Sequence, residues 1–261
     1  MARRCIIFFA ASIVVLVSGC DTLRQMRLLE PTRYDMEQIS SRVYVSKEIP
    51  EGGRRKLLGA YTEGKARVSA FYGGLVTDAI VVGCAEKDCI RSFGGHGDGT
   101  AVSKVTPAVL LWTKVFGAGE VAHEWSHLEL LIRIGPSGAR RTIPNWFHEG
   151  LATVVGDIPR HSEAVYQEAV ASGFPIPPLC ELQTGSQWAE AFEKYPNPKG
   201  LNIVYATAGH EVRGWLHRVG RPGLFEFIES VKAGETFDVA YYRIGHESRM
   251  RCQPDAQQAI N

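Results

Sequence analysis

Two histidines four residues apart, His123 and His127, stand in a stretch with helical patterning, and Glu124 follows the first of them. On a helix, residues four apart lie on one face about a turn apart, so both imidazoles can reach one metal ion. Glu124 can then face a metal-bound water. Zinc lowers the pKa of such a water to about 7, and a carboxylate can take its proton as the water attacks a carbonyl. The alternative is an amphipathic helix with two hydrogen-bonded histidines.

A second segment, WFHEGLA at residues 146–152, follows Pro144 at the start of another predicted helix. Between His127 and Glu149 lie 21 residues, enough for the first helix to end and the chain to turn back. A hydrolytic zinc site uses three protein ligands and one open position. His123, His127 and Glu149 supply such a set, so we expect one Zn²⁺ per chain.

These two segments resemble the gluzincin metallopeptidases, and the WFxEGLA form is typical of bacterial members of the peptidase-MA-like group. The resemblance implies a zincin-like fold, with His123, His127 and Glu149 as zinc ligands and Glu124 as general base. A helix that begins near Tyr205, followed by GETFDVA at 234–240, is similar to the end of that domain.

By the same resemblance, Tyr205 is a candidate donor to the oxyanion of the reaction, and His210 is the alternative donor. The competing interpretation makes Tyr205 a core aromatic at a helix start. Thr153 stands where thermolysin-like members carry an acid that orients a ligand histidine. Asp157 or a backbone carbonyl would have to take that role, and we expect His148 to lie at the surface or beside the ligands.

The N-terminus combines Arg3 and Arg4 with an apolar run over residues 5–17, too short to span a bilayer comfortably. The run ends in VSGC at 17–20, which resembles a bacterial lipobox. We therefore expect a lipoprotein signal peptide at 1–19, and an acylated Cys20 that anchors the protein to a membrane. The Asp21 that follows implies the periplasmic face of the inner membrane of a bacterial envelope.

Cysteine usage agrees with export to an oxidising compartment. Four cysteines remain after the signal and the acylated residue, and sequence alone does not rank their three possible pairings. We favour two disulfides, one that closes a short loop and one that holds the C-terminus, namely Cys84–Cys89 and Cys180–Cys252.

The pattern along the chain predicts an α+β protein, with a small N-terminal β-sheet and the active-site helix before a mostly helical C-terminal part. We expect a tether over 20–53 and one metallopeptidase domain over 54–252. Strands are predicted at 78–84 and 106–115, with a glycine-rich turn at 93–99 between them; the second strand would pair with extended substrate. Helices are expected at 54–72, 118–134, 146–155, 161–172, 186–195, 201–219, 222–233 and 236–244.

The composition is that of a folded protein, with 45% hydrophobic and 22% charged residues. A net charge of +1 and the lack of a basic stripe argue against nucleic-acid binding. Our leading interpretation is a zinc peptidase that cleaves peptide or protein substrates in the cell envelope. The alternatives are a zinc-fold lipoprotein that acts as a binding or scaffold module without turnover, and a lipoprotein with a purely structural metal.

Overall fold

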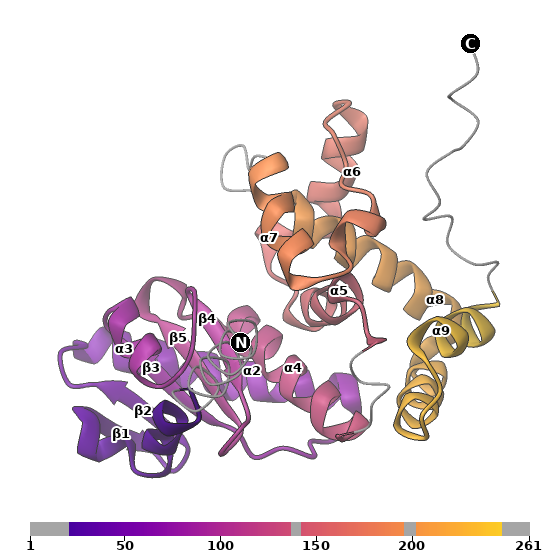
Figure 1. The fold of residues 1–261 in the computed structure, drawn as a ribbon. Helices are drawn as coiled ribbons and strands as arrows, with labels where there is room; N and C mark the ends of the chain where they lie inside the picture. The colour runs from indigo at the N-terminus through magenta and orange to yellow at the C-terminus, as the bar shows by residue number, and fades with distance from the viewer. Residues whose placement is uncertain (1–20, 137–141, 196–201, 247–261) are drawn as a thin grey trace, which may run out of the picture. The chain divides into compact units, whose positions relative to one another are not determined.

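The computed structural model describes residues 21–136, 142–195 and 202–246 of the chain (Figure 1). All strands of this part lie before residue 113, and helices dominate afterwards, so the predicted α+β class is confirmed. The chain divides into two compact units between Leu128 and Glu129, within helix α4 (Ala118–Ile134). Among the described residues, no helix has both the length and the apolar character needed to cross a bilayer.

The first unit contains a five-stranded sheet of order β1-β2-β3-β5-β4. Its strands are β1 (Met36–Ser40), β2 (Val43–Ser46), β3 (Ile80–Cys84), β4 (Gly99–Val102) and β5 (Ala108–Trp112). The inner strands β2, β3 and β5 run parallel, whereas β1 and β4 pair antiparallel at the two edges. Continuous apolar runs form β3 and most of β5, as expected for strands covered on both faces.

This sheet differs from the expected one in two places. Residues 36–46, which we expected in a tether, form β1 and β2, because their buried side chains pack into the same core as β3. The second predicted strand, now β5, pairs on both sides, with β3 and with β4. Its backbone groups are therefore already used, so the prediction that this strand would bind substrate is wrong. The edge strands are β1 and β4, and β4 begins at the end of the glycine-rich stretch that we interpreted as a turn.

Helix α2 (Glu51–Tyr72) holds the first half of α4 in place. Gly64 makes the close approach possible, because a Cβ there would lie 2.7 Å from the Cβ of Val121. Further along, the Tyr72 hydroxyl lies 3.0 Å from Ser126 Oγ. Trp125 Nε1 donates to Thr77 Oγ1 at 2.7 Å. The two residues between Glu124 and His127 are thus buried and hydrogen-bonded, and they fix the rotation of α4 about its axis.

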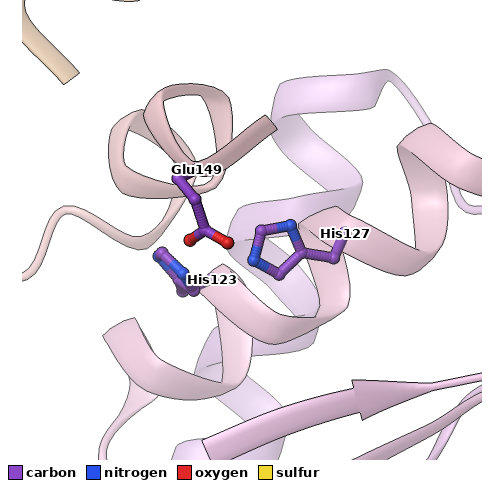
Figure 2. A group of neighbouring side chains, drawn as sticks. All are labelled: His123, His127 and Glu149. Atoms are coloured by element: carbon purple, nitrogen blue, oxygen red, sulfur yellow. The ribbon is translucent and has the colours of Figure 1, made fainter. Parts of the chain in front are cut away.

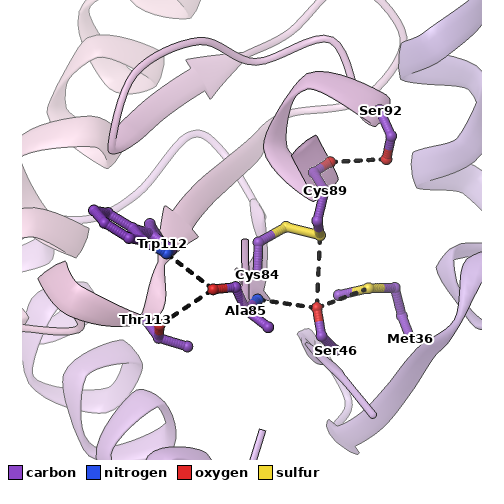
Figure 3. Close-up of a disulfide and its surroundings, with 8 residues drawn as sticks. All are labelled: Met36, Ser46, Cys84, Ala85, Cys89, Ser92, Trp112 and Thr113. Atoms are coloured by element: carbon purple, nitrogen blue, oxygen red, sulfur yellow. Dashed lines mark hydrogen bonds between the residues drawn. A yellow bond between two sulfur atoms is a disulfide. The ribbon is translucent and has the colours of Figure 1, made fainter. Parts of the chain in front are cut away.

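Cys84 and Cys89 form a disulfide that connects the end of β3 to α3 (Lys87–Ser92), with a Cα–Cα distance of 5.6 Å (Figure 3). Ser46 Oγ of β2 accepts from Ala85 N, and Trp112 Nε1 of β5 donates to Ala85 O (Figure 3). This is the short-loop pairing that the sequence analysis favours. Cys180 is also disulfide-bonded, but its expected partner Cys252 lies outside the described residues, as does Cys20.

The second unit is helical, with α5 (Asn145–Gly156), α6 (Glu163–Ala171), α7 (Gly185–Lys194), α8 (Ile203–Lys232) and α9 (Phe237–Gly245). The break that we predicted between 219 and 222 is present inside α8. Gly220 has φ 63° and ψ −174°, a left-handed backbone that favours glycine, and Pro222 follows it.

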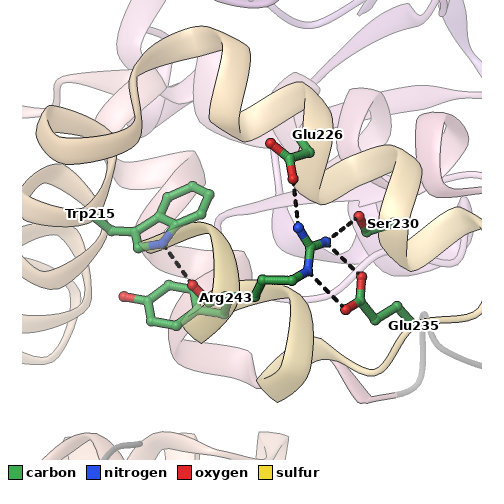
Figure 4. Close-up of polar contacts among 6 residues, drawn as sticks. Trp215, Glu226, Ser230, Glu235 and Arg243 are labelled. Carbon is green, nitrogen blue, oxygen red and sulfur yellow. Dashed lines mark hydrogen bonds and ion pairs between the residues drawn. The ribbon is translucent and has the colours of Figure 1, made fainter. Parts of the chain in front are cut away.

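Aromatic rings form the core of this unit. Neighbouring ring centroids lie 4.9 to 5.7 Å apart among Trp146, Phe147, Trp215, Phe227, Phe237 and Tyr241. Trp215 Nε1 donates to the backbone carbonyl oxygen of Tyr241 at 3.3 Å. Arg243 of α9 donates to Glu226, Ser230 and Glu235, so it ties α9 to the second half of α8 (Figure 4).

Helix α5 crosses α8 at two glycines. A Cβ on Gly150 would lie 2.7 Å from Val212 Cγ2 and closer still to the backbone of Ala208, and one on Gly209 would lie 2.7 Å from Thr153 Cγ2. The glycine that follows Glu149 in the sequence therefore has a packing reason, since it sets how closely the helix of Glu149 approaches α8.

Gly150→Ala should destabilise the protein by about 2 kcal/mol, because the α8 backbone cannot move away as a flexible side chain would. The change in the free energy of unfolding would be measured from the urea midpoint, provided that the m-value stays the same as in wild type. Gly214→Ala is the matched control: it makes the same change in α8, where the nearest atom to the new Cβ is 3.6 Å away. Equal midpoints for the two variants would contradict the close crossing.

Candidate metal centre

Helix α4 presents His123 and His127 from successive turns of one face. Their ring centroids lie 4.9 Å apart with the rings nearly perpendicular, and the side chains are only 5% and 7% exposed. Buried imidazoles at this spacing, on a helix whose rotation is fixed by Trp125 and Ser126, are held ready to share a ligand. The predicted pair is therefore brought together.

The carboxylate of Glu149, on α5, completes a group of three (Figure 2). One ligand atom from each of His123, His127 and Glu149 lies within 4.8 Å of the other two. Figure 2 shows the carboxylate pointing toward both rings. Two imidazoles and one carboxylate are the donor set of many hydrolytic zinc sites, so the group fits a metal ion of that kind.

Glu124 lies against the edge of the sheet. A Cβ on Gly99, the first residue of β4, would be 3.0 Å from Glu124 Oε1 and 3.1 Å from Leu111 Cδ2. The absence of a side chain at residue 99 thus leaves the room that the carboxylate occupies. This relation leaves no local signal in the sequence, because Gly99 and Glu124 lie 25 positions apart and only the packing of β4 and α4 brings them together.

Tyr205 lies in the first turn of α8, where its backbone N–H donates to Oδ1 of the N-cap residue Asn202 at 3.3 Å. Its ring stacks on His161 at a centroid distance of 4.4 Å and packs edge-on against Trp188 at 5.1 Å. These contacts agree with the interpretation of Tyr205 as a packed aromatic at a helix start. Its role as an oxyanion donor stays a prediction.

His210, the alternative donor, is engaged with α6. Its Nδ1 lies 2.8 Å from Glu163 Oε1, its ring stacks on Tyr166, and Arg213 donates to the other oxygen of Glu163. Burial alone would raise the pKa of Glu163, but hydrogen bonds from Gln167 and His210 and the charges of His210 and Arg213 hold it below its usual value. This cluster joins α6 to α8, and it gives His210 a structural explanation.

Three other residues near the ligands were assigned roles in the sequence analysis. His148 is half-buried and is not part of the group of three, since adjacent helical residues point about 100° apart. Asp157 is exposed and ends α5 in the left-handed conformation (φ 48°), so it caps the helix rather than orienting an imidazole. Thr153 packs against Gly209 at the α5–α8 crossing.

Glu129 is fully buried two residues after His127, at a position where an apolar residue would be ordinary. Arg133, one turn later, donates to its carboxylate at 3.1 Å, and the Arg133 guanidinium lies over the ring of Phe225. A buried carboxylate is tolerated only when it is paired. The spacing of Glu129 and Arg133, four residues apart, was the sequence signal for this pair.

Comparison with known proteins adds no family assignment: no protein-family model matches this chain, and no curated protein matches it. The function of the chain is therefore inferred from its residues and their geometry.

Proposed function

We propose that this chain is a zinc-dependent peptidase of the gluzincin type. The observation that carries the proposal is the convergence of His123, His127 and Glu149, with Glu124 next to the first of these ligands and on the helix that holds two of them. Zinc bound there would supply Lewis acidity and make water nucleophilic near neutral pH.

Glu124 is the proposed general base. Its carboxylate would accept the proton that water loses on attacking the peptide carbonyl, and would deliver it to the departing amine when the C–N bond breaks. Tyr205 is our proposed donor to the oxyanion, and Tyr205→Phe would test whether its hydroxyl takes part.

The edge strand β4 is the proposed guide for substrate. An extended peptide that hydrogen-bonds to the outer edge of β4 would pass beside Gly99, and therefore beside the carboxylate of Glu124. This replaces β5, whose two edges are already paired. A main-chain guide recognises peptide backbone rather than one side chain, which suits a peptidase that acts on protein or peptide segments in the envelope.

Zinc content and cleavage, measured on the same samples, test the proposal. Wild-type protein should hold about one zinc per chain and cleave a mixed peptide library in a chelator-sensitive manner. Glu149→Ala should lose most of the zinc and the cleavage, because two imidazoles alone bind zinc weakly. Glu190→Ala, the same change at an exposed carboxylate on α7, should keep both.

The possible outcomes separate the proposed enzyme from its alternatives. Zinc that depends on Glu149 but brings no cleavage would indicate a binding or scaffold module. If the protein keeps its zinc in the presence of a chelator and cleaves no peptide, the metal site would be structural. A wild-type protein without zinc would contradict the metal centre itself.

A further inference from the structure

Residues 21–34, at the start of the described chain, pack on the first unit through every third residue. Residues 21–25 are helical and continue into two 3₁₀ turns, η1 (Met26–Leu29) and η2 (Pro31–Tyr34). Gln25, Leu28 and Pro31 are buried, as expected when about three residues make a turn. Leu28 joins the core beside β3, and Gln25 Oε1 accepts from the Lys104 N–H at 2.9 Å.

A second face of this segment, which is exposed, is also apolar. Leu23, Met26 and Leu29 repeat with the same three-residue spacing and are 66%, 51% and 60% exposed. With Tyr34, which is also exposed, they make up four of the nine large hydrophobic side chains exposed in the described part of the chain. The other five are scattered over both units. A surface segment normally turns polar residues outward, so a cluster of this kind indicates a contact with something apolar.

The position of the segment along the chain indicates what this apolar face contacts. Asp21 directly follows Cys20, the residue that we expect to be acylated. Its carbonyl oxygen lies 3.2 Å from the position of a Cβ on Gly94, so the chain is already against the folded unit one residue after the anchor. Leu29 is then roughly 14 Å from the anchor along a helical path, at 1.5 Å per residue. With an anchor this close, the exposed face can reach the lipid headgroups and the upper acyl chains.

Net charge gives residues 21–35 no electrostatic attraction to a membrane surface. Residues 21–35 carry three basic and three acidic side chains, namely Arg24, Arg27 and Arg33 against Asp21, Glu30 and Asp35. Arg24 pairs with Asp21 at 3.5 Å, and the guanidinium of Arg27 lies 5.0 Å from the ring centre of Tyr34. Arginine and tyrosine at the rim of an apolar patch suit a membrane interface, where their polar ends remain hydrated.

We propose that Leu23, Met26 and Leu29 form a membrane-contacting face, which inserts into the interface of the lipid bilayer that anchors Cys20. The face holds the first unit directly against the membrane rather than on a flexible leash. This proposal concerns the membrane contact alone and does not depend on peptidase activity.

Photolabelling from the bilayer tests this face in the full-length protein after processing. The protein is reconstituted in phosphatidylethanolamine–phosphatidylglycerol vesicles that contain a phospholipid with a diazirine on its acyl chain, and labelled peptides are mapped by mass spectrometry. Label should concentrate on residues 21–34. The variant Leu23→Ser/Met26→Ser/Leu29→Ser should lower that label about tenfold, because serine side chains gain little from entering the interface. Val170→Ser/Val239→Ser, which changes two exposed apolar residues of the second unit, should leave it unchanged.

Three results would overturn the proposal. The first two are photolabelling of residues 21–34 no stronger than that of other residues, and photolabelling that the triple variant keeps. The third is photolabelling that high salt abolishes, because the face has no net charge that salt could screen. A fall in oligomeric mass in detergent on making the triple variant would assign the face to a protein partner instead. An unmodified Cys20 would remove the premise. Unchanged thermal unfolding of the triple variant in detergent would show that its effect is on the contact and not on the fold.

Discussion

Replacing Glu124 with glutamine should lower peptide cleavage by about 10³-fold or more, while zinc stays near one per chain. Glutamine keeps the size and the hydrogen-bonding ability of the side chain but cannot accept a proton at neutral pH, and general-base catalysis contributes about 10²–10⁴-fold. Glu124 is not one of the three grouped ligands, so the metal content should not follow the activity. Few other single changes in this chain should separate the two quantities so widely.

The measurement is turnover of the best-cleaved peptide from the library together with zinc per chain by elemental analysis. Glu190→Gln makes the same chemical change at an exposed position of α7 and should leave both unchanged. Cleavage within about tenfold of wild type in Glu124→Gln would exclude Glu124 as the base. Loss of zinc in this variant would mean that Glu124 supports the ligands rather than moving a proton.

The second large effect is expected at Gly99, a residue with no reactive group. A Cβ at this position meets Glu124 Oε1 at 3.0 Å, and the branched side chain of valine would push the carboxylate further. Because the new Cβ meets the end of a long side chain and β4 is an edge strand, the displacement should cost little stability. A misplacement of about 1 Å in a catalytic group can nonetheless lower turnover about 10²-fold. We therefore expect Gly99→Val to lower turnover about 10²-fold and Gly99→Ala to lower it less, with zinc content and unfolding midpoint close to wild type.

A double-mutant cycle distinguishes this positioning effect from a general disturbance of β4. Combining Gly99→Ala with Glu124→Asp shortens the carboxylate side chain by one methylene, so the added methyl group should cost less activity in that background than in wild type. Gly59→Ala is the matched control, since no atom lies within 4 Å of its new Cβ on α2. Additive losses in the cycle, or a large fall in stability for Gly99→Val, would contradict the proposed role of Gly99.

Local patterns in the sequence predicted the parts of the site that depend on neighbouring residues. The spacing of His123 and His127, the start of α5 after Pro144 and the break near Gly220 follow from helical periodicity and from the backbone limits of proline and glycine. The disulfide between Cys84 and Cys89 is equally local, because only four residues separate the two. Such features involve residues within a few turns of each other, and they can be inferred without knowledge of the fold.

The tertiary structure alone decided the features that join distant segments. Residues 36–46 have weak periodicity. They form β1 and β2 only because β2 pairs with β3 and because their buried side chains pack into a core shared with β3. Strand pairing likewise decided that β4, and not β5, is an edge strand, and helix packing placed Gly99 beside Glu124. Non-local contacts of this kind depend on how the whole unit packs. The sequence therefore determined which residues could bind metal and move a proton, and the packing of distant segments determined how Glu124 is placed and which edge strand lies beside it.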